Sequence, residues 1–204
     1  MTYEGLRRDV REVCSHFPAE YWRGLDDGRR YPEEFVAAMT EAGYLGALIP
    51  EEYGGMGFDL SAGVRSWRRS TGAGPMRSHA QMYTMGTLLR HGFEEQKREY
   101  LPKIARGDLR LQAFAVTEPE AGTDTTSIKS MATREGDHYV VNGRKVYISR
   151  VEQSDLMILL ARTIPSEQVA KRSGGLSVFL VDLREAEGLI VRPRRVMMNN
   201  APAS

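Results

Sequence analysis

The hydrophobic period of this chain changes near Gly107, and this change constrains the fold more than any other feature. Before Gly107, apolar residues such as Leu6 and Val10 recur at the spacing of one helix face, about every 3.6 residues. After it, short β-branched runs alternate or end at turn residues, which is typical of strands. The sequence therefore predicts an α+β fold, with an all-α domain at residues 1–108 and a small antiparallel β-barrel or sandwich at residues 109–204.

Punctuation by proline and glycine places further helices in the first part. A helix is expected to begin at Pro32 and end at Gly43, because proline suits the first helical turn and glycine suits the end. A weaker helix is expected over Leu60–Arg69. Another, with methionines and leucines along one face, is expected to stop at Gly92. A methionine stripe of this kind is more often core packing than a ligand site.

The second part reads as a series of short strands. Asn142-Gly143 is a strong hairpin signal, and the polar stretch Ser166–Gly175 is expected to be a loop. The expected strands are Arg110–Val116, Tyr139–Val141, Lys145–Ser149, Leu156–Arg162, Leu176–Val181 and Leu189–Val191.

Composition excludes several classes of protein. The 204 residues are 41% hydrophobic, and 28 Lys and Arg balance 27 Asp and Glu, so no overall charge favours nucleic acid or an anionic membrane. The longest apolar run, Leu156–Ala161, is far shorter than the roughly 20 residues of a membrane span. Charged residues interrupt the N-terminal segment, unlike a secretory signal, so we expect a cytoplasmic protein.

Two local features carry no chemistry of their own. Cys14 has no cysteine partner, so it predicts neither a disulfide nor a metal site and is expected to pack as a small apolar residue. The cluster Gly54–Gly57 lacks the strand-to-helix context of a dinucleotide-binding fingerprint, and we interpret it as a loop.

A polar loop follows the apolar run that ends at Ala115. The stretch Ala115–Ser127 reads AVTEPEAGTDTTS, and its short hydroxyl side chains each donate and accept hydrogen bonds. Pro119 and Gly122 stop regular structure. Such a loop suits a polar heterocycle or a diphosphate, although a generic cluster of these residues is more often simply a turn.

The order of residues in this loop resembles the signature of the acyl-CoA dehydrogenases, flavoproteins that desaturate acyl thioesters. The resemblance covers nearly the whole chain. The other matching motifs are Leu48–Gly57 (LIPEEYGGMG), Glu94–Lys97 (EEQK), Tyr100–Pro102 (YLP) and Asn142–Ser149 (NGRKVYIS).

The resemblance implies that FAD lies against the β-rich domain. Thr117 and backbone near Val116 are expected to bind the polar edge of the flavin ring. Thr123 is expected to contact both the cofactor and the thioester substrate, whereas Glu118 and Asp124 are expected to fix the loop. The implied cofactor-binding residues are Phe114, Ala115, Val116, Thr117, Glu118, Gly122, Thr123, Tyr147, Ile148 and Ser149.

Tyr147 stands where the family usually has tryptophan, which keeps a flat ring and loses the indole donor. Strand alternation predicts that Tyr147 and Ser149 share one face. The family's base is a glutamate in a C-terminal helical domain, so no catalytic residue is identifiable here, and the chain is expected to be a truncated member that is inactive alone.

The implied activity is removal of an α-proton from an acyl-CoA with hydride transfer to flavin, and electron-transfer flavoprotein is the expected acceptor. The thioester carrier is either coenzyme A or an acyl carrier protein, and the complete protein is expected to be a homotetramer or dimer. Two alternatives stay open: an acyl-CoA oxidase or flavin monooxygenase on the same scaffold, and a non-catalytic subunit of a split dehydrogenase.

Overall fold

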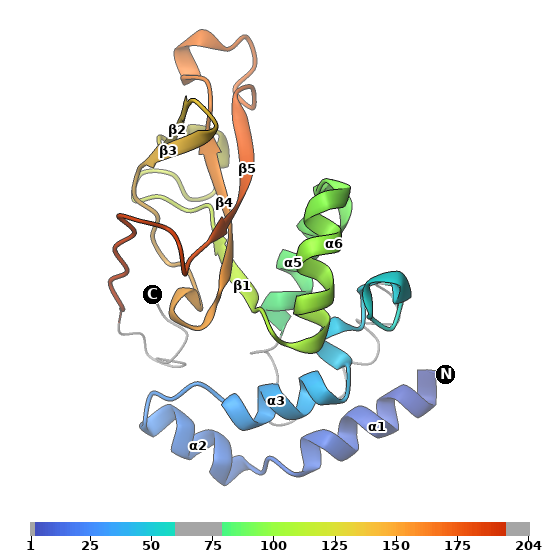
Figure 1. Cartoon of the computed structure of the whole chain (residues 1–204). Coiled ribbons are helices and arrows are strands. Elements are labelled where there is room, and N and C mark those ends of the chain that lie inside the picture. The colour runs from blue at the N-terminus through green and yellow to red at the C-terminus, as the bar shows by residue number, and fades with distance from the viewer. Residues whose placement is uncertain (1–2, 60–78, 195–204) are drawn as a thin grey trace. The chain divides into compact units, whose positions relative to one another are not determined.

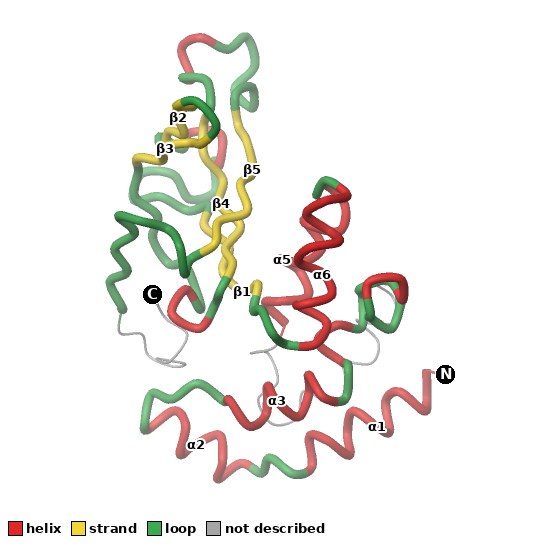
Figure 2. Tube along the Cα trace, in the orientation of Figure 1, coloured by secondary structure: helices red, strands yellow, loops and turns green. Residues whose placement is uncertain are grey.

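The computed structural model describes residues 3–59 and 79–194, which divide into two compact units. A helical unit runs through Leu111, and a sheet unit starts at Gln112 (Figures 1 and 2). The prediction of a helical part followed by a sheet is therefore confirmed. In the part of the chain that the structure describes, no helix is long and apolar enough to cross a membrane.

The helical unit is built around an aromatic core. Its α-helices are α1 (Tyr3–Ser15), α2 (Ala19–Asp27), α3 (Glu33–Glu41), α5 (His79–His91) and α6 (Glu94–Arg106), with short 3-10 turns η1 (Tyr44–Gly46) and η2 (Glu51–Tyr53). Phe35 of α3 is fully buried and meets the rings of Phe17 and Trp22 edge-on at 5.2 and 5.0 Å. Cys14 packs half-buried against this cluster, as expected. The helix expected over Leu60–Arg69 lies outside the described residues.

Proline marks the start of a helix, and glycine the end, largely where the sequence predicts. Pro32 immediately precedes α3, and Gly43 adopts a left-handed conformation with φ of 76° just after it. Gly107 ends α6 with φ of 81°, and a Cβ at this position would lie 2.5 Å from Thr40 Cγ2. Gly107 is therefore required both by its dihedral angle and by close packing on α3.

The sheet unit holds one mixed sheet of five strands. The strands are β1 (Leu111–Ala115), β2 (Met131–Glu135), β3 (His138–Asn142), β4 (Leu156–Arg162) and β5 (Leu176–Asp182). Their order is β1-β4-β2-β3, and β5 also pairs with β4. Pairs β2–β3 and β4–β5 are antiparallel, whereas β2 meets β4 in parallel at Met131 and Arg162. Buried β4 residues Met157 and Leu159 pack against Ala113 and Ala115 of β1.

The prediction of a hairpin at Asn142-Gly143 is wrong. The β2–β3 turn is Gly136-Asp137, with Gly136 at φ of 65°, and Asn142 is the last residue of β3. Gly143 serves packing instead, because a Cβ there would lie 2.1 Å from Ser130 Oγ. The β2 strand was missed because only its first two residues face away from solvent.

Two predicted strands are absent from the structure. Lys145–Ser149 is irregular because Tyr147 has a φ of 60°, which a β-strand does not accommodate. Leu189–Val191 is an exposed coil with no strand partner among the described residues. An apolar segment therefore does not form a strand on composition alone; a neighbouring strand must also supply hydrogen bonds.

Substitution of Gly107 and Gly24 by alanine should change stability in opposite directions. Gly107→Ala places a Cβ at positive φ and against Thr40, so we expect a loss of about 1–3 kcal/mol in the free energy of unfolding. Gly24 lies inside α2, and a Cβ there meets nothing within 4 Å, so Gly24→Ala should gain about 0.5–1 kcal/mol. Chemical denaturation measures both. If Gly107→Ala left the free energy of unfolding unchanged, the close packing of Gly107 against Thr40 of α3 would be contradicted.

Candidate functional site

The polar loop after β1 begins with a tight turn that closes on itself. Glu118 N–H donates to the Ala121 carbonyl at 3.0 Å, and Ala121 N–H donates back to the Glu118 carbonyl at 3.2 Å. Pro119 lies inside this turn, where its fixed φ is favourable. The turn directs the side chain of Glu118 inward, and this residue is only 5% exposed.

The Glu118 carboxylate joins three segments of the sheet unit. Its oxygens accept hydrogen bonds from Lys129 N–H at 2.6 Å, from Ser130 N–H at 3.0 Å and from Ser130 Oγ at 2.5 Å. Lys145 Nζ donates to Glu118 Oε1 at 2.9 Å and also to the Val116 carbonyl at 3.0 Å. The expectation that Glu118 fixes the loop through backbone hydrogen bonds is confirmed.

Hydrogen bonding keeps this buried carboxylate ionised. Burial is the largest influence and raises the pKa of Glu118, but the hydrogen bonds from Lys129, Lys145 and Ser130 together outweigh it and lower the pKa to about 2. Burial likewise lowers the pKa of Lys145, and the hydrogen bond and charge of Glu118 oppose that change. An ionised carboxylate with all these donors around it is not available as a proton acceptor.

A second buried charge anchors the other end of the loop. Arg162 closes β4, is 2% exposed, and donates to backbone carbonyls. The acceptors are Thr126 at 2.6 Å, Ile128 at 3.0 Å, Gly174 at 3.1 Å and Arg172 at 3.2 Å. A planar guanidinium supplies several donors in fixed directions, which a lysine could not replace. Arg162 thus ties the loop to the β4–β5 connection.

Asp124 shapes the middle of the loop at its surface. Its carboxylate accepts hydrogen bonds from Thr126 N–H at 3.1 Å and from Ser127 Oγ at 2.7 Å, and it pairs with Arg172. The Thr126 hydroxyl also donates to Asp124, and this side-chain hydrogen bond first, then that from the Ser127 hydroxyl, lowers the pKa of Asp124 to about 2. Asp124 is therefore a loop-fixing residue, as the sequence predicts.

One backbone hydrogen bond brings the two predicted cofactor-binding segments together. Val146 N–H donates to the Thr117 carbonyl at 2.9 Å, so the segment carrying Tyr147 and Ser149 lies beside Thr117. Val146 and Ile148 are buried, whereas Tyr147 and Ser149 are exposed. Tyr147 and Ser149 are therefore both accessible, but the strand alternation that predicted a shared face for them is absent, because the segment is not a strand.

The predicted site residues divide into a buried group and an exposed group. Ala115, Glu118 and Ile148 are buried, and Val116 and Thr117 are half-buried. Gly122 and Thr123 are exposed, and a Cβ at Gly122 would meet nothing within 4 Å. Buried Ala115 and Ile148 belong to the core of the sheet unit.

The exposed group fits a flat, polar cofactor such as a flavin. Phe114 and Tyr147 leave 43% and 69% of their surface exposed, and Arg194 stacks over the Tyr147 ring at 5.2 Å. Within the described residues, neither Thr117 N–H nor the hydroxyls of Thr117, Thr123 and Ser149 have a protein hydrogen-bond partner. These are the group types that hold a planar heterocycle by its face and its polar edge.

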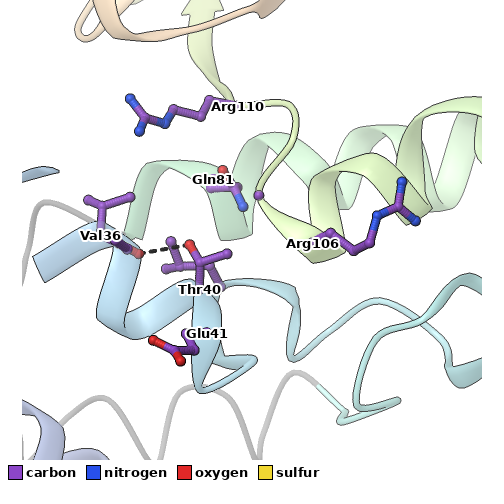
Figure 3. Close-up of a pocket in the computed structure, with 9 residues that line it drawn as sticks. Val36, Thr40, Glu41, Gln81, Arg106 and Arg110 are labelled. Atoms are coloured by element: carbon purple, nitrogen blue, oxygen red, sulfur yellow. Dashed lines mark hydrogen bonds between the residues drawn. The ribbon is translucent and has the colours of Figure 1, made fainter. Parts of the chain in front are cut away.

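The helical unit contains a separate cavity of about 450 Å³. Figure 3 shows it between α3 and α5, with Gln81 near its centre and Thr40 Oγ1 donating to the Val36 carbonyl at 2.7 Å. Arg110 at its edge pairs with Glu33 at 2.6 Å. None of the residues predicted from the signature loop lines this cavity, so we place the candidate site in the sheet unit.

Sequence reasoning missed Lys145, Ser130 and Arg162 as parts of the site. Arg162 had a detectable signal, because an arginine ends the otherwise apolar strand Leu156–Arg162. Ser130 had no signal, and Lys145 had only its place in the matching motif Asn142–Ser149, because their partner Glu118 is distant in sequence. No group of three or more His, Cys, Asp or Glu that could hold a metal ion is found in the described part of the chain.

Comparisons with known proteins match both units. Residues 2–108 match the family model for the acyl-CoA dehydrogenase N-terminal domain, and residues 113–204 match the model for the acyl-CoA dehydrogenase middle domain. The chain is 35% identical to glutaryl-CoA dehydrogenase of Desulfococcus multivorans over 191 residues. This match covers 90% of this chain and 48% of the dehydrogenase.

Solved structures agree. An acyl-CoA dehydrogenase from Geobacillus kaustophilus is 26% identical with a TM-score of 0.87. The match covers 98% of this chain and 53% of the Geobacillus chain. The prolyl acyl carrier protein oxidase AnaB is 28% identical with a TM-score of 0.86, at 98% and 53% coverage. The chain spans about half the length of the curated relatives that it matches.

Replacing the central carboxylate should change both stability and its pH dependence. Because the pKa of Glu118 falls from 4.5 to about 2 on folding, its ionisation stabilises the fold above pH 4.5, and this contribution of about 3 kcal/mol is lost as pH falls from 4.5 to 2. Glu118→Gln should cost about 3–5 kcal/mol at pH 7 by leaving Lys145 unpaired, and should flatten that acid dependence.

Urea denaturation between pH 2 and 7 measures this effect. Glu120→Gln is the matched control, since Glu120 occupies the same turn and is exposed. If Glu118→Gln kept the acid dependence of the unsubstituted protein, the carboxylate would not be the stabilising group.

Proposed function

The chain belongs to the acyl-CoA dehydrogenase family, and from this premise we propose that its sheet unit binds FAD for α,β-desaturation of an acyl thioester. The proposal is supported above all by the donors of Thr117 and Ser149, which have no protein partner among the described residues and which one backbone hydrogen bond places in adjacent segments. Bound FAD would supply the hydride acceptor of the reaction. The protein's own contribution is to bind, orient and stabilise that acceptor.

The loop residues are suited to a ring that gains negative charge. The N–H and hydroxyl of Thr117 and the hydroxyl of Ser149 are available to donate hydrogen bonds to the ring. Donors held in place before reaction stabilise developing charge at no cost in reorganisation. Tyr147 and Phe114 offer flat apolar surface for the face of the ring. Thr123 lies further along the exposed loop, and we propose that it meets the thioester as well as the cofactor.

We assign no base for α-proton abstraction among the described residues. Glu118 is ionised but is occupied by its hydrogen bonds, and it lies buried rather than facing a ligand. A base must reach the proton it removes in a site that excludes water. We therefore propose that the 204 residues on their own bind flavin without desaturating acyl thioesters.

The electron acceptor and the thioester carrier define a second candidate function. The similarity to prolyl acyl carrier protein oxidase favours an oxidase that passes electrons to oxygen and accepts a carrier-protein thioester. The dehydrogenase alternative uses electron-transfer flavoprotein and an acyl-CoA, in line with the similarity to glutaryl-CoA dehydrogenase. Oxygen consumption compared with dye reduction, in the protein that contains this chain, separates the two.

Loss of the free hydroxyls should weaken flavin binding without unfolding the protein. Thr117→Val and Ser149→Ala each remove one donor, and each should raise the FAD dissociation constant by about 5- to 20-fold, equivalent to about 1–2 kcal/mol. Flavin fluorescence titration measures the binding, and thermal unfolding checks the fold. Thr133→Val is the control, because Thr133 is an exposed β2 hydroxyl outside the loop. Unchanged affinity in both variants would place the flavin elsewhere.

A further inference from the structure

The peptide group between Val116 and Thr117 connects the buried ion pair to the proposed flavin site. Its carbonyl accepts a hydrogen bond from Lys145 Nζ at 3.0 Å. The peptide is trans, so the N–H of Thr117 points in the opposite direction from that carbonyl. This N–H has no acceptor among the described residues. One end of the peptide therefore meets a cation, and the other end is open to a ligand.

A cation on the carbonyl strengthens the donor at the other end. Hydrogen bonds in series polarise one another, and the effect grows where water is excluded. The side chains of Lys145 and Glu118 are only 11% and 4% exposed, so solvent screens this interaction weakly. The Glu118 carboxylate shares its charge among several other donors, whereas the ammonium contacts the Val116 oxygen directly.

We propose that Lys145 is a positioning residue that acts through the Val116–Thr117 peptide to favour reduced over oxidised flavin. This inference rests on the proposed function, because it requires the flavin edge to accept from Thr117 N–H. Reduced flavin carries more negative charge at that edge than the oxidised form, so a stronger donor stabilises it more. Lys145 contacts no cofactor itself in this arrangement, and its effect is indirect.

The test compares Lys145→Met with Lys129→Met in the FAD-loaded protein. Lys129 is exposed, and only its backbone takes part in the network, so its side chain is a matched control. Lys145→Met should reduce the preference for reduced over oxidised FAD about 10-fold, which is a fall of about 30 mV in the two-electron potential. Lys129→Met should leave the potential unchanged, and Lys145→Arg should restore most of the loss.

An unchanged potential in Lys145→Met would overturn the proposal. Should this variant not fold because Glu118 is left unpaired, the double variant Glu118→Gln/Lys145→Met removes both charges, a change that buried pairs often tolerate. The double variant should show the same fall in potential, and a potential equal to that of the unsubstituted protein would contradict the inference.

A measurement without flavin separates this inference from the proposed function. The amide proton of Thr117 should move upfield in Lys145→Met and stay in place in Lys129→Met, because only the first change removes the cation from the Val116 carbonyl. A protein that does not bind FAD but shows this shift would refute the flavin site and leave the polarised peptide standing. The absence of a shift would refute the role of Lys145 directly.

Discussion

The buried ion pair between Glu118 and Lys145 is the interaction on which the rest of the site depends. Burying two charges costs several kcal/mol per ion, and only good geometry with additional hydrogen bonds offsets that cost. Here the carboxylate also receives two backbone N–H groups and a serine hydroxyl, and the ammonium also reaches a carbonyl. Removing either partner would leave the other charge uncompensated, so the pair specifies one arrangement of three chain segments.

This pair and Arg162 together hold a loop whose composition would otherwise leave it irregular and mobile. Glu118 fixes the first turn, and Arg162 fixes the carbonyls of Thr126 and Ile128 further along. Thr117 lies just before the first anchor and Thr123 lies between the two, and neither hydroxyl has a protein hydrogen-bond partner among the described residues. The buried charges thus fix the loop backbone at several points, and in the proposed function this arrangement would hold hydrogen-bond donors in place for a ligand before reaction.

Local patterns in the sequence predicted the parts of the fold that local physics determines. The strand Leu156–Arg162 was predicted with its observed bounds. A strand that is buried along nearly its whole length is typically a continuous apolar run, and this run is plain in the sequence. The Asn142-Gly143 hairpin failed because glycine serves two needs, and here it allows Ser130 to approach closely rather than turning the chain. The positive φ of Tyr147 likewise depends on tertiary contacts that no periodicity records.

The site was predictable only as far as the residue types that it contains. The loop hydroxyls and the loop-fixing roles of Glu118 and Asp124 followed from the sequence and its family resemblance. The pairing of Glu118 with Lys145 joins positions 27 residues apart, and it was not predicted because no local rule selects one lysine among many for burial. Long-range electrostatic partners of this kind are evident only once the chain is folded.

The most direct test of this account is an amide NMR titration of the protein with FAD. If the buried pair presents one binding surface, the largest changes should fall on the amides of Val116, Thr117 and Tyr147–Ser149, with smaller changes at Lys129 and Ser130. Changes confined to residues around the helical-unit cavity, such as Gln81 and Thr40, would contradict the account, because they would place the cofactor away from the loop that Glu118 and Lys145 hold.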